Sequence, residues 1–330
     1  MKKRTKSVPF NLLGVCFLFV LGCGLSALAQ APANAKIAFV SFRDGNREIY
    51  LMDADGKNPV NLTRHPDDDI APAWSPDGKQ IAFTSGRKGK RNEIYLMDAD
   101  GKNVRKLFRD FDFGENSSPT WSPDGKQIAF MHDIRGFPDI YVANVDGSNP
   151  TPLTKDPDAA DFAPTWSPDG KQIAFHRSRR GDRLSAIYVV DIQTQQVRRL
   201  TNGPWDESPA WSPDGTKIAF SSDDGVGNIY VMNNDGSNIV KVSDNPGPIA
   251  TRNPDWSPDG RHIVYEWAVR NEKELNFEIF VINIDGSNPR QLTNSPRLDA
   301  WADWFDPAVL AVNLKDKLLT TWGRLKKGAR

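Results

Sequence analysis

Cysteine is almost absent from this chain. Its 330 residues include two cysteines, Cys16 and Cys23, and both lie near the N-terminus. This scarcity excludes a small scaffold held together by disulfides. Net charge is also absent, because 42 Lys and Arg residues balance 42 Asp and Glu residues. A neutral chain gives no reason to expect nucleic acid as a partner.

One extended hydrophobic run is present, from Phe10 to about Leu25, and basic residues precede it. The sequence Ala27-Leu28-Ala29 after this run fits the pattern of small residues at a signal-peptide cleavage site. We therefore expect residues 1–29 to be a signal peptide and the mature chain to be exported, either periplasmic or secreted. No stable transmembrane span would then remain in the mature chain.

A second interpretation of the same run involves Cys23. The segment Val20-Leu21-Gly22-Cys23 resembles a bacterial lipobox. In that alternative the protein is a lipoprotein anchored at Cys23. Under cleavage after Ala29 the mature chain has no cysteine at all, and its fold is independent of disulfides.

An internal repeat determines the expected fold. A segment of the form Trp-Ser-Pro-Asp-Gly-x-x-Ile-Ala-Phe recurs, with the last complete copy reading Ile-Val-Tyr at its end. The copies begin at Trp74, Trp121, Trp166, Trp211 and Trp256, and a decayed copy begins at Trp304. Proline at the second turn position and glycine after it predict a tight turn between two strands.

Two further segments recur with the same period as this repeat. One reads Ile-Tyr or Ile-Phe, then two apolar residues and usually Asp-Gly, and the other contains a Leu-Thr pair that we expect to form the last strand of each unit. Four short β-strands in a period of about 45 residues are typical of one propeller blade.

The order of the strands predicts how the ring closes. The chain begins with an Ile-Ala-Phe strand at Ile37 and ends with a tryptophan strand at Trp304. We therefore expect an all-β fold, a six-bladed β-propeller with four-stranded blades over residues 30–307. The C-terminal strand would pair with the N-terminal blade and remove the open edges. The six repeat tryptophans are assigned to the blade cores.

The two faces of this disc differ in sequence. The tight turns after the tryptophan strands and the Asp-Gly turns share one face, and they are nearly uniform. The loops on the opposite face vary in length and composition, and variable loops on a rigid scaffold are a usual place for binding.

A set of residues on the variable face is expected to surround the mouth of the central channel. Its six ring members each stand five positions before a repeat tryptophan, and two glutamates lie beside them. We call these eight residues the collar: Asp69, Asn116, Asp161, Asp206, Thr251, Asp299, Glu115 and Glu207. Such a ring would suit a cation, or basic and N–H groups of a peptide. The alternative is that each Asp satisfies nearby backbone amides.

Motifs for catalysis are missing from the sequence. It contains no nucleophile elbow, phosphate-binding loop or dinucleotide fingerprint. The four histidines fall in separate repeats, and we expect His176, Arg177 and Asp182 to form a solvated surface cluster. We therefore predict no catalytic residue, no metal ligand and no cofactor, with Ca²⁺ in the channel as the alternative.

The last segment, residues 308–330, differs from the repeats. It carries six Lys or Arg residues and one Asp, interleaved with apolar residues. We expect this basic C-terminal tail to pack on the rim of the propeller, or alternatively to contact an anionic surface. Once the basic excess of residues 1–29 and of the tail is set aside, the propeller itself is acidic.

The repeated Trp-Ser-Pro-Asp-Gly-Lys-Gln-Ile-Ala-Phe at 74–83, 121–130 and 166–175 resembles the WD40-like (PD40) repeats of TolB-type propellers, as does Ile-Tyr-Leu-Met-Asp-Ala-Asp-Gly at 49–56 and 94–101. The resemblance covers about residues 37–307. It is limited to the propeller, because the stretch between residue 29 and Ile37 is too short for the α/β domain that precedes the propeller in TolB.

This resemblance implies a non-catalytic scaffold for protein–protein interaction in the bacterial periplasm or cell envelope. The implied partner is an envelope protein or peptide, such as a Pal-like lipoprotein. It would bind at the channel mouth, where Asp69, Asp161, Asp206 and Asp299 lie. The alternative function is a propeller enzyme or binder that acts on envelope glycans or peptides in the central channel.

Overall fold

The computed structural model describes residues 35–307, except 88, 90, 110, 112–113, 135, 182–183, 224–226, 245–250 and 271–274. The predicted signal peptide, residues 1–29, and the basic C-terminal tail, residues 308–330, lie outside the described residues. Within the part that is described, no helix is both long and apolar enough to cross a membrane.

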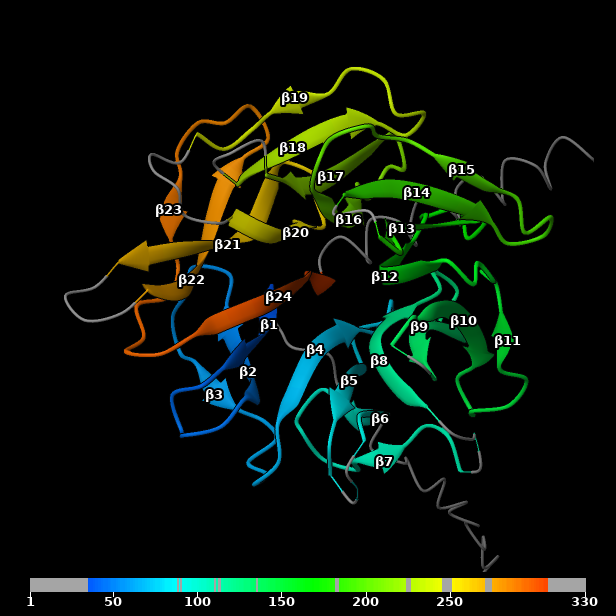
Figure 1. Cartoon of the computed structure of the whole chain (residues 1–330). Coiled ribbons are helices and arrows are strands. Elements are labelled where there is room, and N and C mark those ends of the chain that lie inside the picture. The colour runs from blue at the N-terminus through cyan, green and yellow to red at the C-terminus, as the bar shows by residue number, and fades with distance from the viewer. Residues whose placement is uncertain are drawn as a thin grey trace, which may run out of the picture.

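Six four-stranded antiparallel sheets surround a central axis (Figure 1), which confirms the six-bladed propeller. From the axis outward, blade 1 contains β24 (Asp299–Phe305), β1 (Lys36–Ser41), β2 (Glu48–Asp53) and β3 (Val60–Asn61), and blade 2 contains β4 (Asp69–Trp74), β5 (Gln80–Ser85), β6 (Glu93–Asp98) and β7 (Arg105–Lys106). Blade 3 contains β8 (Glu115–Trp121), β9 (Gln127–Asp133), β10 (Asp139–Asn144) and β11 (Thr151–Pro152).

The other three blades have the same order. Blade 4 contains β12 (Ala159–Trp166), β13 (Gln172–Arg179), β14 (Ser185–Asp191) and β15 (Val197–Arg199). Blade 5 contains β16 (Asp206–Trp211), β17 (Lys217–Ser222), β18 (Asn228–Asn233) and β19 (Val240–Lys241). Blade 6 contains β20 (Thr251–Trp256), β21 (His262–Arg270), β22 (Leu275–Asn283) and β23 (Arg290–Gln291).

The closure of the ring is confirmed as well. The last strand, β24, pairs antiparallel with the first strand, β1, so that Trp304 lies opposite Ile37 and Asp299 lies opposite Ser41. Blade 1 is therefore built from both ends of the described chain. We call the junction where β24 meets its neighbours the seam.

Hydrogen bonds from side chains to each other and to the backbone stabilise the Ser-Pro-Asp-Gly turns. In the first of them, the Ser75 hydroxyl donates to the carboxylate of Asp77 at 2.8 Å and accepts the N–H of Gln80 at 2.9 Å. Gly78 adopts a φ of +66°, which favours glycine. The same Ser–Asp bond recurs in the other four turns at 2.6–2.7 Å.

The hydrophobic core lies between consecutive blades. One cluster, for example, joins Val40 and Ile49 of blade 1 to Trp74, Ile81 and Phe83 of blade 2. The tryptophans of the five complete repeats are only 4–8 % exposed, which agrees with their assignment to the core. Because each cluster needs two blades, no blade buries its apolar surface alone.

The position of the outermost strands differs from the sequence prediction. These strands have two or three residues, and in blades 1, 3, 4 and 6 they end directly before the Leu-Thr pair. The threonine itself has another role. In blade 1 the Thr63 hydroxyl accepts the N–H of Ile49 at 3.0 Å, and Thr293 does the same for Ile279 at 2.9 Å. The hydroxyl thus attaches the end of each of these blades to its third strand.

The seam has a contact that the other junctions lack. Phe305 takes the place of the serine that follows the other repeat tryptophans. Its ring stacks on Trp74 with centroids 5.1 Å apart. The ring also covers Gly78 so closely that an added Cβ would lie 2.0 Å from Phe305 Cζ. By comparison, a Cβ at Gly125, with a similar φ of +70°, would lie 3.9 Å from Pro76.

These two glycines provide a matched test of the seam. We expect Gly78→Ala to destabilise the protein by about 1–3 kcal/mol more than Gly125→Ala, because only the first displaces an aromatic ring of the closing strand. The backbone strain of a positive φ is common to both variants and cancels in the comparison. Urea unfolding of the two variants measures the difference, and equal losses would show that Phe305 does not secure the seam.

Candidate functional site

The collar is a ring at one end of the inner strands, but its six ring members are buried. Four of them begin β4, β16, β20 and β24, and the other two lie near the start of β8 and β12. All six, Asp69, Asn116, Asp161, Asp206, Thr251 and Asp299, are 0–3 % exposed. Glu115 is exposed and Glu207 is half-buried. The two glutamates are therefore the members of the collar that an incoming partner can reach.

Arginines on the second strand or the loop after it occupy three of these aspartates. Asp161 forms a two-pronged ion pair with Arg177, at 2.6 and 2.7 Å. Asp299 accepts a hydrogen bond from Arg43 at 2.8 Å, and Asp69 pairs with Arg87. Burial raises the pKa of Asp69 and of Asp299, and the arginines oppose that rise. The backbone amides proposed as the alternative partners from sequence are thus not the main partners of these three carboxylates.

Each of these arginines also lies over an aromatic pair of its own blade. The Arg177 guanidinium carbon is 5.4 Å from the ring centre of Phe175 and 5.2 Å from that of Tyr188. Arg43 and Arg87 repeat the arrangement over the phenylalanine and tyrosine of blades 1 and 2. Blade 3 uses a neutral version, in which His132 Nδ1 lies 2.8 Å from Asn116 Oδ1. The ring members therefore form one half of a buried polar pair in these four blades.

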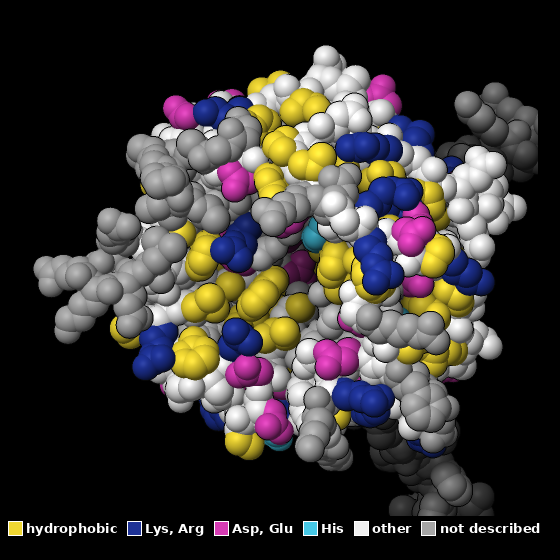
Figure 2. Space-filling view, in the orientation of Figure 1, with side chains coloured by type: hydrophobic (Ala, Val, Ile, Leu, Met, Phe, Trp, Pro, Cys, Tyr) yellow, Lys and Arg dark blue, Asp and Glu magenta, His cyan; other side chains and the backbone are white. Residues whose placement is uncertain are grey.

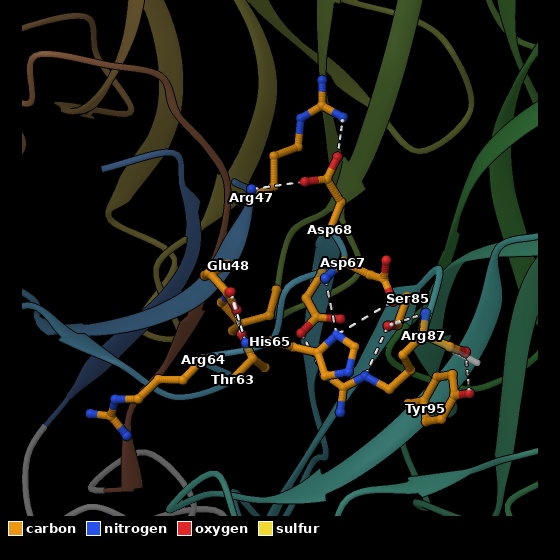
Figure 3. A network of polar contacts seen from close by, with 12 residues as sticks. Arg47, Glu48, Thr63, Arg64, His65, Asp67, Asp68, Ser85, Arg87 and Tyr95 are labelled. Carbon is orange, nitrogen blue, oxygen red and sulfur yellow. Dashed lines mark hydrogen bonds and ion pairs between the residues drawn. The ribbon is translucent and has the colours of Figure 1, made fainter. Parts of the chain in front are cut away.

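The loop that leads into β4 is attached to β2 at the channel mouth (Figure 3). Glu48 accepts the N–H of His65 at 2.8 Å, and the hydroxyl of Thr63 also donates to Glu48. The backbone N–H of Arg47 donates to the carboxylate of Asp68 at 2.9 Å. Side-chain hydrogen bonds in both directions thus attach the loop that begins blade 2 to blade 1.

Further along the channel, the inner strands enclose a cavity of about 180 Å³, to which each of the six contributes three residues. Figure 2 shows a hollow near the centre of the disc, with hydrophobic, acidic and histidine side chains in it and basic side chains around it. Each inner strand is kinked by a bulge, where a residue other than glycine has a φ of 48–51°: Ala71, Ser118, Ala163, Ser208, Asn253 and Trp301. A bulge of this kind re-aims the strand.

Side chains of the preceding blade satisfy the backbone at these bulges. His176 Nδ1 accepts the N–H of Ser208 at 3.2 Å, and Glu266 accepts the N–H of Trp301 at 2.6 Å. Burial lowers the pKa of His176 to about 3 and raises that of Glu266 to about 7. At neutral pH the His176 ring is therefore uncharged and acts as an acceptor.

The structure corrects the expected surface cluster around His176. The imidazole stacks on Phe162, with centroids 5.1 Å apart and planes 17° from parallel. Arg177 is buried in its pair with Asp161, and Asp182 lies outside the described residues. Adjacent strand residues point to opposite faces of a sheet, so His176 and Arg177 belong to two separate networks.

Two channel carboxylates that the sequence analysis missed lie at the seam. Asp255 of β20 and Asp303 of β24 hydrogen-bond each other. Asp255 also accepts the N–H of Trp304 at 3.0 Å, and Asp303 accepts the N–H of Trp74 at 2.5 Å. The pair thereby ties β20, β24 and β4 together. The sequence does carry a signal for this pair. The residue before the repeat tryptophan is Asp in these two copies, whereas it is Ala or Thr in the other four.

Burial raises the pKa of both members of this pair. Asp255 is raised to about 6, and Asp303 is raised further because the Asp255 charge adds to the effect of burial. One proton shared between the two carboxyl groups lowers the cost of burying their charge and removes the repulsion between two carboxylates in contact. Within the described residues, no three His, Cys, Asp or Glu side chains gather as metal ligands, and Ca²⁺ in the channel stays a prediction.

The buried ion pairs of the collar predict a large loss of stability on truncation. We expect Asp69→Ala to cost about 3–5 kcal/mol, because Arg87 would remain buried without its carboxylate. Asp206→Ala removes an acceptor of the Gly203 N–H and should cost about 1–3 kcal/mol. Urea unfolding measures both values. Equal small losses would show that the arginine pairs do not stabilise the fold.

The channel pair predicts a pH dependence with a definite sign. A carboxyl whose pKa is raised on folding stabilises the protein below its unfolded value, near pH 4, and that contribution is lost as the pH rises through 6. Asp303→Asn mimics the protonated form. We therefore expect this variant to gain on the order of 1–2 kcal/mol over the natural protein between pH 4 and pH 8.

Thermal unfolding across this pH range tests the sign, with Asp77→Asn as the control. Burial acts to raise the pKa of Asp77, but bonds from Ser75 and Lys79 lower it overall. Its contribution therefore has the opposite pH dependence. A difference between Asp303→Asn and the natural protein that stays constant with pH would contradict the raised pKa values.

The comparisons with known proteins agree with this architecture. The family model PD40, the TolB beta propeller domain, matches residues 24–110 and 118–302. The Tol-Pal system protein TolB of Desulfosudis oleivorans is 48 % identical over 56 residues, which are 17 % of this chain and 13 % of that protein. The TolB homolog of Chlorobaculum tepidum is 48 % identical over 59 residues, 18 % of this chain and 14 % of that protein. The matches thus span a small part of these curated relatives.

Solved structures extend the likeness over most of the chain. TolB from Acinetobacter baumannii aligns with a TM-score of 0.69 at 25 % identity, over 82 % of this chain and 66 % of that chain. A putative TolB from Agrobacterium tumefaciens aligns with a TM-score of 0.63 at 24 % identity, over 82 % and 98 %. An oligogalacturonate lyase in complex with manganese, at 16 % identity and a TM-score of 0.54, shares only the fold. With more than half of its residues matched by the PD40 model, the chain belongs to the family of TolB β-propeller domains.

Proposed function

We propose that this protein is a non-catalytic scaffold that binds an envelope protein or peptide at the mouth of its channel. The observation that carries the proposal is an exposed apolar pair beside the collar. Trp205, which directly precedes Asp206, is 43 % exposed, and Leu184 is 44 % exposed. Residues 185 and 205 form a β-bridge, so the two side chains belong to adjoining loops. An exposed tryptophan is a common anchor of protein interfaces.

Arginine–aromatic pairs on the loops and strand ends of the same face add to this surface. The guanidinium of Arg252 lies 4.0 Å from the ring centre of Phe277. Arg297 lies 5.2 Å from Phe42, and Arg180 lies 5.3 Å from Phe137. Arginine and aromatic residues are enriched at interface cores. Glu115 and Glu207 of the collar supply accessible negative charge on the same face, which would suit basic or N–H groups of the partner.

The proposed partner is a Pal-like lipoprotein or another envelope protein. Its support is the family, because the relatives are named as Tol-Pal system proteins. The proposal places the mature chain in the periplasm or outside the cell, after removal of residues 1–29. Anchoring through a lipid at Cys23 is the other arrangement that the sequence supports. Either arrangement presents the propeller on the outer side of the inner membrane.

The channel offers less support for an enzyme acting on glycans or peptides. Its 180 Å³ cavity is smaller than the 300–1,000 Å³ common for small-molecule sites. The two carboxylates there, Asp255 and Asp303, already hold backbone N–H groups of β24 and β4. Turnover of an envelope polysaccharide that is lost in Asp255→Asn would favour the enzyme instead.

Titration calorimetry with the soluble domain of the same bacterium's Pal-like lipoprotein tests the proposed surface. We expect Trp205→Ala to weaken binding about 30-fold or more, as loss of an interface anchor does. The change should leave the unfolding temperature nearly unchanged, because the side chain is exposed.

Val240→Ala is the control for this experiment. Val240 is 60 % exposed on the outer strand β19, away from the channel mouth, so its replacement should leave the affinity unchanged. Unaltered binding by Trp205→Ala would place the interface elsewhere. Equal weakening by both variants would show that the effect is not specific to the mouth.

A further inference from the structure

A large cavity lies at the seam, on the face of the uniform turns. It has a volume of about 660 Å³ and lies between blades 6 and 1. Its walls are the last Ser-Pro-Asp-Gly turn, the end of β24, and the Asp-Gly turns of both blades. We call it the seam cavity. The collar and the exposed Trp205 lie on the opposite face, at the other end of the inner strands.

The number of turns explains why the cavity is here. The ring has six blades but five Ser-Pro-Asp-Gly turns, and consecutive turns touch. A Cβ added at the glycine of one turn would lie 3.4–3.9 Å from the proline of the turn before it, at Gly125, Gly170, Gly215 and Gly260. Pro258 belongs to the last turn, and β24 continues as Phe305-Asp306-Pro307 in place of a sixth turn. The seam cavity therefore occupies the place of the absent turn.

An aromatic wall distinguishes this cavity. Trp304 is half-buried and lines it, whereas the other five repeat tryptophans are buried. The imidazole of His262 stacks beside the Trp304 ring, with centroids 6.3 Å apart and planes 29° from parallel. The missing turn thus leaves part of an indole surface open.

The charge of the cavity is negative. Three carboxylates line it, Asp55, Asp259 and Asp306, against the single guanidinium of Arg290. A hydrogen bond from Lys57 lowers the pKa of Asp55. For Asp259, burial acts in the raising direction, but bonds from Ser257 and Arg261 lower the pKa overall. Asp55 and Asp259 are therefore ionised at neutral pH.

We propose that the seam cavity binds an arginine or lysine side chain of a partner peptide, with the cation between the Trp304 ring and the carboxylates of Asp259 and Asp306. Cations bind favourably over the face of tryptophan, and a hydrogen bond between a cation and a carboxylate is about twice as strong as a neutral one. The volume exceeds that of one side chain, so flanking peptide residues also fit. This site is independent of the function proposed for the channel mouth.

The probe for this site is the tripeptide acetyl-Gly-Arg-Gly-amide, measured by titration calorimetry on the full chain. Acetyl-Gly-citrulline-Gly-amide has nearly the same shape without the charge. We expect the arginine peptide to bind at least tenfold more tightly than the citrulline peptide. Equal affinity of the two peptides would overturn the proposal, because the cation would then contribute nothing.

Asp259→Asn and Asp77→Asn form a matched pair of variants. Both residues occupy the same position of a Ser-Pro-Asp-Gly turn, and both accept the hydroxyl of the preceding serine. Any loss of turn stability is therefore common to both. We expect Asp259→Asn to weaken the arginine peptide about five- to tenfold and Asp77→Asn to leave it unchanged. Equal weakening by the two variants would overturn the proposal.

A third variant separates a partner from this chain's own basic residues. Residues 308–330 follow Asp306 closely and carry six Lys or Arg residues. With those six changed to Gln in the full chain, we expect unchanged affinity for the arginine peptide. A clear gain in affinity would mean that a basic residue of this segment, and not a partner, is the occupant of the cavity.

Discussion

The pairing of β24 with β1 is the constraint on which the rest of the structure depends. Every core cluster joins two blades, so the apolar faces are covered only when the ring is complete. The chain leads from each blade into the next, including from blade 6 into β24 of blade 1, whereas β24 is joined to β1 by strand pairing without a connecting turn. Removing the free edges of blade 1 also removes a template for unwanted pairing with other chains. Features that occur once in the six blades therefore gather at the seam.

Three of these features reinforce the same strand. Phe305 stacks on Trp74 where the other copies have serine. Asp255 of β20 accepts a backbone N–H of β24, and Asp303 of β24 accepts a backbone N–H of β4. The carboxyl pair is formed in a poorly solvated channel, where two negative charges repel and one shared proton relieves the repulsion. The strand that closes the ring is thus held by contacts that depend on protonation as well as on packing.

The sequence was sufficient to predict the fold because the repeat is regular. Tryptophan, the Ser-Pro-Asp-Gly turn and Ile-Ala-Phe recur in one register, and the first and last copies indicate how the ring closes. The outer strands were misplaced by one or two residues, because the Leu-Thr pair resembles a strand but serves to attach its threonine to the third strand.

The side-chain partners of the collar residues could not be predicted from the repeat. The position of its six ring members follows from the period, but their partners do not. Arg87 stands six residues after Ile81, whereas Arg177 stands four residues after Ile173. Blade 3 uses His132 and Asn116 in place of Arg and Asp. Because a buried polar pair is retained in these four blades while its charge, spacing and residue types change, a search for a fixed motif misses it.

The seam also changes how the two faces of the disc should be interpreted. Uniform turns on one face suggest that this face serves only folding, and for the five complete turns the Ser–Asp hydrogen bonds support that view. A closed ring made from an open chain nevertheless needs one junction without a turn. At that junction the repeated packing of proline against glycine ends, and Trp304 and three carboxylates line a cavity. The same strand pairing that completes the core therefore creates a second concave surface, at a place that the uniform repeat alone does not reveal.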